Sequence, residues 1–198
     1  MTDEKGSYAF VVAHPSVIWQ PSAEWGVIWG IADERITAMS EKWDLRFLRL
    51  AKEVSTWSKD RSTQVGAVIV GDDKTPGPYG FNGFPRTIDD EVEDRHSRPL
   101  KYKWTEHAER NAIYNAARIG MSLKGCTIYV THLPCADCTR AIVQVGIKRV
   151  VVDSDSLENA DFASRWSEDD KITKAMLDEA RVDLGLVSAS QDPGGDDD

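Results

Sequence analysis

The sequence TIYVTHLPCADCTRAIVQVGIKRVVV, residues 127–152, decides the fold. Its two ends, 127–131 and 148–152, are short runs of β-branched, aromatic and aliphatic residues that are typical of buried strands. Pro134 favours a helix start, because the first turn of a helix does not need the N–H that proline lacks, and residues 136–145 are expected to be helical. Strand, helix and strand in this order predict an α/β fold with a partly parallel sheet.

The remaining sequence continues the alternation of helices and strands. Further elements are expected as helices over 41–58, 107–119 and 167–180, and as strands over 65–70, 79–82 and 182–186. The helix over 167–180 is expected to bury Ile172, Ala175 and Met176. Together these elements predict a three-layer α/β/α sandwich with a central, mixed, five-stranded sheet.

Length and composition limit the organisation of the chain. Its 198 residues, 41% of them hydrophobic, suffice for one domain with a sizeable core. We expect this domain over 40–187, preceded by an N-terminal extension over 1–39 of unknown role. The acidic tail over 188–198 has no apolar anchor and is expected to be disordered.

The net charge and the cysteine content indicate which classes of ligand the chain can bind and in which cellular compartment it lies. A formal net charge of -9 argues against broad electrostatic binding of DNA or RNA, and a mononucleotide fits better than a polynucleotide. Three cysteines provide no disulfide framework, and no long apolar segment or cleavable signal is present. We therefore expect a cytoplasmic protein that does not bind membranes.

Three candidate metal ligands stand in two short motifs. His107 opens a helical segment, and Cys135 and Cys138 are three residues apart, so both thiols project from one face of a first helical turn. A helix start favours the thiolate, which is the form that binds metal. A catalytic zinc keeps three protein ligands and leaves its fourth position to water, whereas a structural zinc is normally closed by four. This set therefore predicts a hydrolytic zinc site.

Glu109 stands two residues after His107 and does not share its direction on a helix. It is placed to move protons beside the metal without being a ligand, which is the position of a general base. The order H-x-E…P-C-x-x-C is the signature of zinc-dependent nucleobase deaminases. The alternative is a structural zinc or a redox pair of thiols, but a structural site would need a fourth ligand, and Cys126 opens a strand-like run.

The connection over 84–106 is longer than most loops within compact domains, and loops of this length are usually functional or disordered. It mixes basic and acidic residues and directly precedes His107. Two interpretations stay open, a solvated loop of mixed charge and a phosphate-binding lid.

Beyond the metal motifs, several segments resemble the deoxycytidylate (dCMP) deaminases of the cytidine deaminase-like superfamily. The segments that carry the resemblance are RSTQVGAVIV (61–70), GFNGFPR (80–86), HAERNAI (107–113) and YVTHLPC (129–135). The resemblance covers roughly residues 41 to 187. It implies a cytidine deaminase-like fold and a zinc-dependent nucleotide deaminase domain over 40–187.

The resemblance also implies roles for residues outside the metal motifs. Asn82 would bind the sugar 3′-hydroxyl and the base pocket, and Arg61 would bind the substrate phosphate. Arg118 matches a family arginine close to the active site and the subunit boundary. Because His96 is the only cysteine or histidine between Arg61 and Glu106, a second zinc is not expected, and one Zn²⁺ per chain is predicted.

The expected activity is the hydrolytic, zinc-dependent deamination of a cytosine deoxynucleotide, dCMP to dUMP, with release of ammonia. Alternative substrates are a modified cytosine nucleotide such as 5-methyl-dCMP, dCTP, or a free nucleoside. An alternative of another class is a zinc-stabilised binding module without catalysis. Family members commonly form homo-oligomers, so a hexamer or a smaller assembly is expected.

Overall fold

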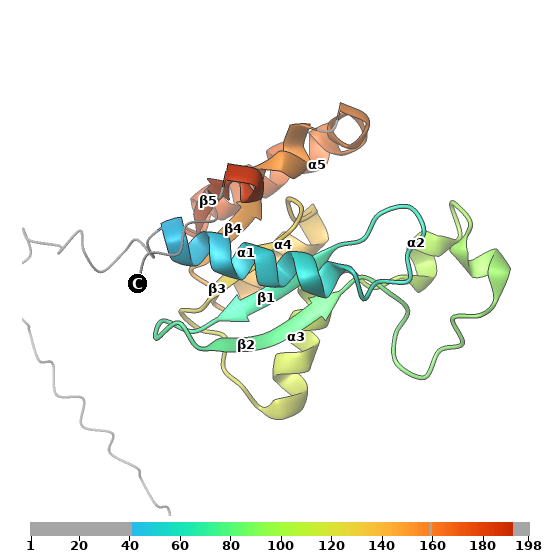
Figure 1. Cartoon of the computed structure of the whole chain (residues 1–198), viewed down its shortest axis with the longest axis horizontal. Coiled ribbons are helices and arrows are strands. Elements are labelled where there is room, and N and C mark those ends of the chain that lie inside the picture. The colour runs from blue at the N-terminus through green and yellow to red at the C-terminus, as the bar shows by residue number, and fades with distance from the viewer. Residues whose placement is uncertain (1–40, 159, 192–198) are drawn as a thin grey trace, which may run out of the picture. The chain divides into compact units, whose positions relative to one another are not determined.

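A computed structural model describes residues 41–158 and 160–191 of the chain (Figure 1). The extension expected over 1–39 and residues 192–198 of the tail expected over 188–198 lie outside the described residues. Residues 188–191 of that tail are described, with a 3₁₀ turn at Ala189–Gln191 and a hydrogen bond from the Ser188 hydroxyl to Asp155 at 2.6 Å. Within the described part, no helix has the length and apolar character needed to span a bilayer.

The centre of the fold is a mixed sheet of five strands in the order β2-β1-β3-β4-β5. The strands are β1 (Gly66–Val70), β2 (Pro76–Phe81), β3 (Thr127–Val130), β4 (Arg149–Asp153) and β5 (Asp183–Val187). β1 runs antiparallel to β2 and β3, whereas β3, β4 and β5 are parallel to one another. The mixed, five-stranded sheet predicted from the sequence is thus confirmed.

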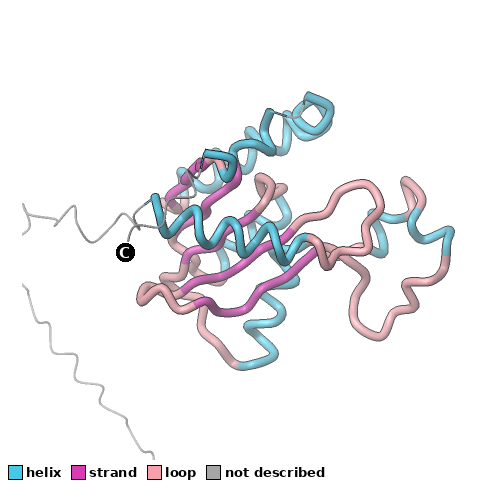
Figure 2. The backbone as a smooth tube through the Cα atoms, viewed as in Figure 1, coloured by secondary structure: helices cyan, strands magenta, loops and turns pink. Residues whose placement is uncertain are grey.

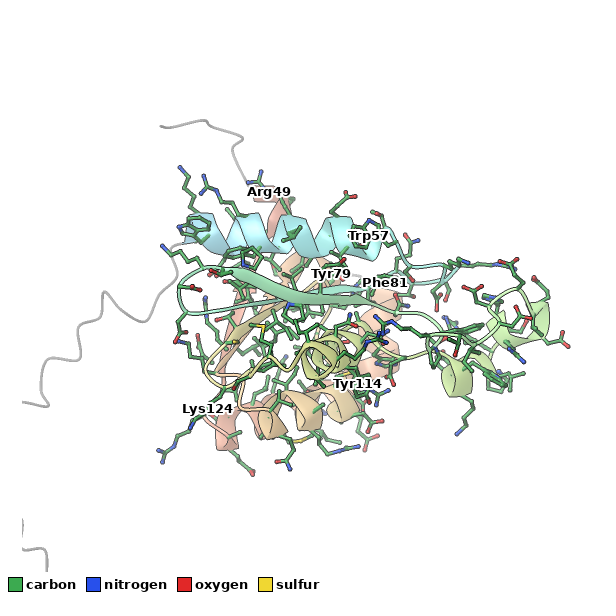
Figure 3. The ribbon with its side chains drawn as sticks, turned by 90° about the horizontal axis from the view of Figure 1, so that it is seen from below. Arg49, Trp57, Tyr79, Phe81, Tyr114 and Lys124 are labelled. Atoms are coloured by element: carbon green, nitrogen blue, oxygen red, sulfur yellow. The ribbon has the colours of Figure 1, made fainter. Side chains whose placement is uncertain are left out.

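Helices cover both faces of this sheet (Figures 1 and 3). The long helices are α1 (Glu41–Ser55), α3 (Ala108–Ile119), α4 (Ala136–Gln144) and α5 (Ala160–Glu179). Side chains alternate along each strand, so Val68 and Tyr129 pack with α1, whereas Ile69 and Ile128 pack with the cluster formed by α3, α4 and α5. This arrangement confirms the three-layer sandwich.

A buried charge network joins α1 to the sheet. Asp44 of α1 is 3% exposed and accepts a hydrogen bond from the Tyr129 hydroxyl at 2.8 Å. The Arg149 guanidinium donates to both Asp44 oxygens at 2.9 and 3.0 Å. The carboxylate is therefore satisfied on both oxygens, as a buried charge requires.

The edge strand β2 is held close to α1 and α3. Trp57, just after α1, contacts Tyr79 and Phe81 edge-on, with ring centroids 5.3 and 6.2 Å apart (Figure 3). On the α3 side, a Cβ at Gly80 would lie 2.3 Å from the carbonyl oxygen of Ala108. Glycine is therefore required at this position, and its presence brings the end of β2 next to the start of α3.

Two regions differ from the sequence predictions. The connection over 84–106 contains a 3₁₀ turn at Glu93–His96 and the short helix α2 (Lys101–Trp104) (Figure 2). α5 begins at Ala160, seven residues earlier than expected, and Ile172 is 43% exposed. Over residues 168–179, the part of α5 whose burial is described, Thr173 and Leu177 are buried, and the Thr173 hydroxyl bonds to the segment that precedes α4.

Candidate metal centre and active-site cavity

Two helix starts meet at the candidate metal centre. His107 is the N-cap of α3 and Cys135 is the N-cap of α4, and both have extended backbones. Cys138 lies in the first turn of α4, where it is completely buried. The sequence predicted this convergence from the two motifs.

The three side chains have the spacing that a tetrahedral zinc requires. The His107 Nδ1 atom lies 3.5 Å from the Cys135 Sγ atom and 3.5 Å from the Cys138 Sγ atom. Zn–S and Zn–N bonds of ordinary length at a tetrahedral angle imply an N···S separation of about 3.5 Å. Among the described residues, these three form the one group of histidine, cysteine and carboxylate side chains close enough to hold a metal ion.

The electrostatics of the two thiols also favour a cation between them. A hydrogen bond from Cys138 lowers the pKa of Cys135 to about 4, so this thiol is ionised at neutral pH. The same contact raises the pKa of Cys138, because a second thiolate beside the first is unfavourable without a positive charge. A divalent ion removes this conflict, since two thiolates and a neutral imidazole balance its charge.

Glu109 lies in the first turn of α3 and is 4% exposed. Loss of hydration in this buried position raises the pKa of its carboxyl group. Its oxygens are not part of the group of three candidate metal ligands. Glu109 thus lies in the first turn of the helix that His107 begins, and its predicted role in proton transfer stays a prediction.

A cavity of about 640 Å³ opens onto these groups. Its lining includes His107, Glu109 and Cys135 of the candidate site, together with Asn82, His132 and Arg98. Its volume lies within the range typical of small-molecule sites.

Two threonines support the cysteine segment, and the sequence reasoning missed both. The hydroxyl of Thr139 donates to the Cys135 carbonyl at 2.9 Å, and the hydroxyl of Thr173 in α5 donates to the Pro134 carbonyl at 2.9 Å. The two hydroxyls lie 3.1 Å apart, and both threonines are fully buried. The available signal for Thr173 was its position between Ile172 and Ala175, two residues that were predicted to be buried.

Glu106 forms a further support that the sequence reasoning missed. Its Oε1 atom accepts a hydrogen bond from the His107 backbone N–H at 3.0 Å and from the Arg110 Nε at 2.6 Å. Its backbone pairs with Gly83, two residues after the end of β2. The start of α3, which carries His107 and Glu109, is thus fixed to the edge of the sheet.

Asn82 lines the cavity, as expected of a substrate-binding residue, and is also bonded to the backbone. Its amide donates to the Thr63 carbonyl at 2.9 Å and accepts from the Val65 N–H at 2.8 Å. One amide hydrogen and one lone pair of the oxygen are left for a ligand. Its predicted contact with the sugar stays a prediction.

The structure does not bring the two predicted arginines to this cavity. Arg61 forms a bidentate pair with Glu93, at 2.5 and 2.9 Å, and lines a neighbouring cavity of about 330 Å³. Arg118 is exposed near the end of α3, eleven residues or about 16 Å along the helix from His107. Their roles toward substrate stay predictions.

Comparison with known proteins gives a consistent result. A family model described as the cytidine and deoxycytidylate deaminase zinc-binding region matches residues 41–154. An uncharacterized deaminase in the luxG 3′ region of Aliivibrio fischeri is 42% identical over 146 residues, which are 74% of this chain and 94% of that protein. A probable deoxycytidylate deaminase of Caenorhabditis elegans is 40% identical over 151 residues, which are 74% of this chain and 71% of the relative.

The fold is also found in a solved structure. The crystal structure of dCMP deaminase from the cyanophage S-TIM5, in complex with dCMP and dUMP, matches with a TM-score of 0.59 at 24% sequence identity. The match covers 76% of this chain and 100% of the phage chain.

Proposed function

Because the chain belongs to the cytidine and deoxycytidylate deaminase family, which binds zinc, we propose that it removes the amino group of a cytosine deoxynucleotide by hydrolysis. The proposed reaction converts dCMP to dUMP and ammonia. The observation that carries it is that the buried Glu109 lines the same cavity as His107 and Cys135, which form the candidate metal group with Cys138.

The zinc site is assigned to His107, Cys135 and Cys138, with one ion per chain. Zinc held there supplies a Lewis acid that activates water for attack on C4 of the cytosine ring. The matching of N···S distances to tetrahedral geometry supports this assignment.

Glu109 is assigned the proton transfers. Its carboxylate accepts a proton from the attacking water and delivers it to N3 of the base. It then accepts the proton of the new hydroxyl group at C4 and delivers it to the amino group, so that the C4–N bond breaks, C4=O forms and ammonia leaves. The raised pKa of Glu109 supports both directions of transfer, because a carboxyl group titrating closer to neutral pH both accepts and returns a proton readily.

The preference for dCMP rests on the relatives. The C. elegans protein is named a probable deoxycytidylate deaminase, and a human relative 35% identical over 128 residues is named deoxycytidylate deaminase. Asn82 at the cavity wall, with its spare donor and acceptor, is assigned to the sugar and base of the nucleotide. Arg61 and Arg118 are retained as candidates that assembly or loop movement would have to bring to the substrate.

The proposal is tested by measuring ammonia release from dCMP, deoxycytidine, dCTP and 5-methyl-dCMP under identical conditions. We expect dCMP to have the highest kcat/KM, and Cys135→Ala to lose both bound zinc and activity. A chain that binds zinc but releases ammonia from no cytosine compound would be a binding module instead. A higher kcat/KM for another compound in the panel would change the substrate and leave the deaminase assignment intact.

We also propose a cellular compartment and an oligomeric state for the chain. The free thiols of the metal site fit a reducing compartment, so we assign the protein to the cytoplasm. We also assign it a homo-oligomeric state, which light scattering on the full-length chain measures directly.

A further inference from the structure

The cavity that holds the candidate site contains several acidic side chains. Asp169 and Asp170 of α5 line it, together with Asp60, Asp137 and Glu109. Asp60 forms an ion pair with Lys101, and Asp137 forms one with Arg140. Asp169 and Asp170 add negative charge to the cavity wall. A phosphate group entering this cavity therefore needs a cation that is not already paired.

Lys101 lines the cavity but is already paired. Its Nζ atom donates to both Asp60 oxygens, at 3.0 and 2.8 Å, and to the Ser62 hydroxyl at 2.6 Å. The Lys101 and Asp60 side chains are 10% and 11% exposed. Moving Lys101 to a ligand would leave Asp60 as an unpaired, largely buried charge, which is costly.

Arg98 lines the same cavity and has a free guanidinium. It lies in the turn that leads into α2, and the Lys101 N–H donates to the Ser97 carbonyl at 2.8 Å to hold this turn. Within residues 41–158 and 160–191, no hydrogen bond, ion pair or ring contact engages its side chain. Of the arginines and lysines on this cavity wall, Arg98 is thus the one ready to bind an anion.

We propose that Arg98 binds the 5′-phosphate of the substrate and selects the nucleotide over the nucleoside. This inference rests on the proposed deaminase function and names the residue that reads the phosphate. An arginine guanidinium forms two parallel hydrogen bonds to phosphate oxygens, which gives both affinity and orientation. A second consequence follows from Asp169 and Asp170, which repel the additional charge of a triphosphate, so dCTP is a poorer substrate than dCMP.

Arg61 is the rival for this role. It faces the neighbouring cavity and is engaged by Glu93 through two hydrogen bonds, so binding a phosphate would require it to leave this partner. Arg98 needs no such exchange.

The test compares Arg98→Gln, Arg98→Lys and Arg61→Gln with Lys103→Gln as the matched control. Lys103 is an exposed residue of α2 that lines neither cavity, so its substitution removes the same charge from the same part of the chain. For each full-length, zinc-loaded protein, kcat and KM are measured for dCMP, dCTP and deoxycytidine.

We expect Arg98→Gln to raise KM for dCMP about 10- to 100-fold, the value of a charge-assisted hydrogen bond, with little change in kcat. The kcat/KM for deoxycytidine should stay the same, which shows that the variant is folded and active. Arg98→Lys should recover part of the loss, and Lys103→Gln should behave like the wild type.

Three outcomes would overturn the inference. The first is an unchanged ratio of dCMP to deoxycytidine kcat/KM in Arg98→Gln, and the second is a wild type with no preference for dCMP over deoxycytidine. The third is loss of that preference in Arg61→Gln but not in Arg98→Gln, which assigns the phosphate to Arg61. If the proposed deaminase function itself were wrong, the wild type would deaminate none of the three compounds, and this result differs from all three outcomes above.

Discussion

Glu109 combines burial with a location in the first turn of α3, two residues from a candidate metal ligand. A glutamine at this position keeps the shape but neither accepts nor returns a proton. We expect Glu109→Gln to retain zinc and its unfolding transition and to lose kcat by about 10²–10⁴-fold, the usual contribution of a general acid–base group. Ammonia release and elemental analysis of zinc on the same sample measure both quantities.

Glu179→Gln is the control for this prediction. Glu179 is an exposed residue at the end of α5, so its substitution makes the same chemical change away from the cavity. Near-normal turnover in Glu109→Gln would remove the proposed role, and loss of zinc in this variant would make Glu109 a ligand.

At the scale of single residues, the sequence predicts a functional group best when its side chains lie within one helical turn. His107 and Glu109 share one helical turn, as do Cys135 and Cys138, so their relative directions follow from helix periodicity. Arg61 and Arg98 are different, because their environment depends on the path of the connection over 84–106. That path places Glu93 against Arg61 and leaves the Arg98 side chain on the cavity wall.

α5 holds the metal segment in place through Thr173. The hydroxyl group bonds to the Pro134 carbonyl and lies next to the Thr139 hydroxyl, which bonds to the Cys135 carbonyl. Thr173→Val keeps the side-chain volume and removes the bond to Pro134 and the contact with the Thr139 hydroxyl, so the segment that carries Cys135 is held less firmly. We expect zinc affinity to fall about tenfold, as for other residues that orient metal ligands, when measured by competition with a chelating indicator.

Thr56→Val makes the same change at an exposed hydroxyl that bonds to the Glu53 carbonyl. It should leave zinc affinity unchanged. Equal affinities for Thr173→Val and the wild type would show that α5 does not support the metal site.

α2 is fastened to the segment before β1 by the Asp60–Lys101 pair. Burial opposes ionisation of Asp60, but hydrogen bonds from Lys101, Ser62 and Thr63 outweigh it, and the pKa of the carboxyl group lies below its usual value. A lowered pKa in the folded state stabilises the fold above the unfolded pKa, and this contribution is lost as the pH falls through the folded pKa. We expect Asp60→Asn to lower the free energy of unfolding by about 1–3 kcal/mol at pH 7.

Urea unfolding at several pH values measures this effect. The difference between wild type and Asp60→Asn should be constant from pH 7 to about pH 5 and should shrink below about pH 4. Asp72→Asn, which removes an exposed pair with Lys148, should change stability little. A difference that grows as the pH falls would contradict the assigned role of the Asp60 carboxylate.

At the scale of helices and strands, periodic apolar patterns predicted the sheet and most helices, because burial of one face determines both. The pattern failed in α5, where Ile172 is exposed and Thr173 is buried, because a hydrogen bond to a distant segment decides which face turns inward. It also gave no signal for α2, whose four residues are held by the Lys101 contact with Asp60. Long-range polar contacts of this kind are not encoded in local periodicity.

For the molecule as a whole, the candidate metal centre joins elements that are distant in sequence. His107 begins α3 after the connection from β2, and the two cysteines begin α4 after β3, so one ion would join two helices of the same layer that are distant in sequence. Contacts between α3 and α4 and between α4 and α5 extend this link across the helical layer. Metal occupancy should therefore affect the stability of the domain as well as its activity.

Removal of the metal tests this link. A ligand that binds the folded state at 100 times its Kd stabilises it by about 2.7 kcal/mol, which corresponds to about 5–10 °C in Tm for a domain of this size. We expect a chelator to lower Tm by at least this amount and to abolish ammonia release, and added zinc to restore both. Cys135→Ala should have the low Tm of the chelated protein and should not respond to zinc. If Tm falls and recovers while no ammonia is released at any stage, the ion stabilises the fold but the chain is not a deaminase; if neither quantity changes, the three side chains do not hold the metal.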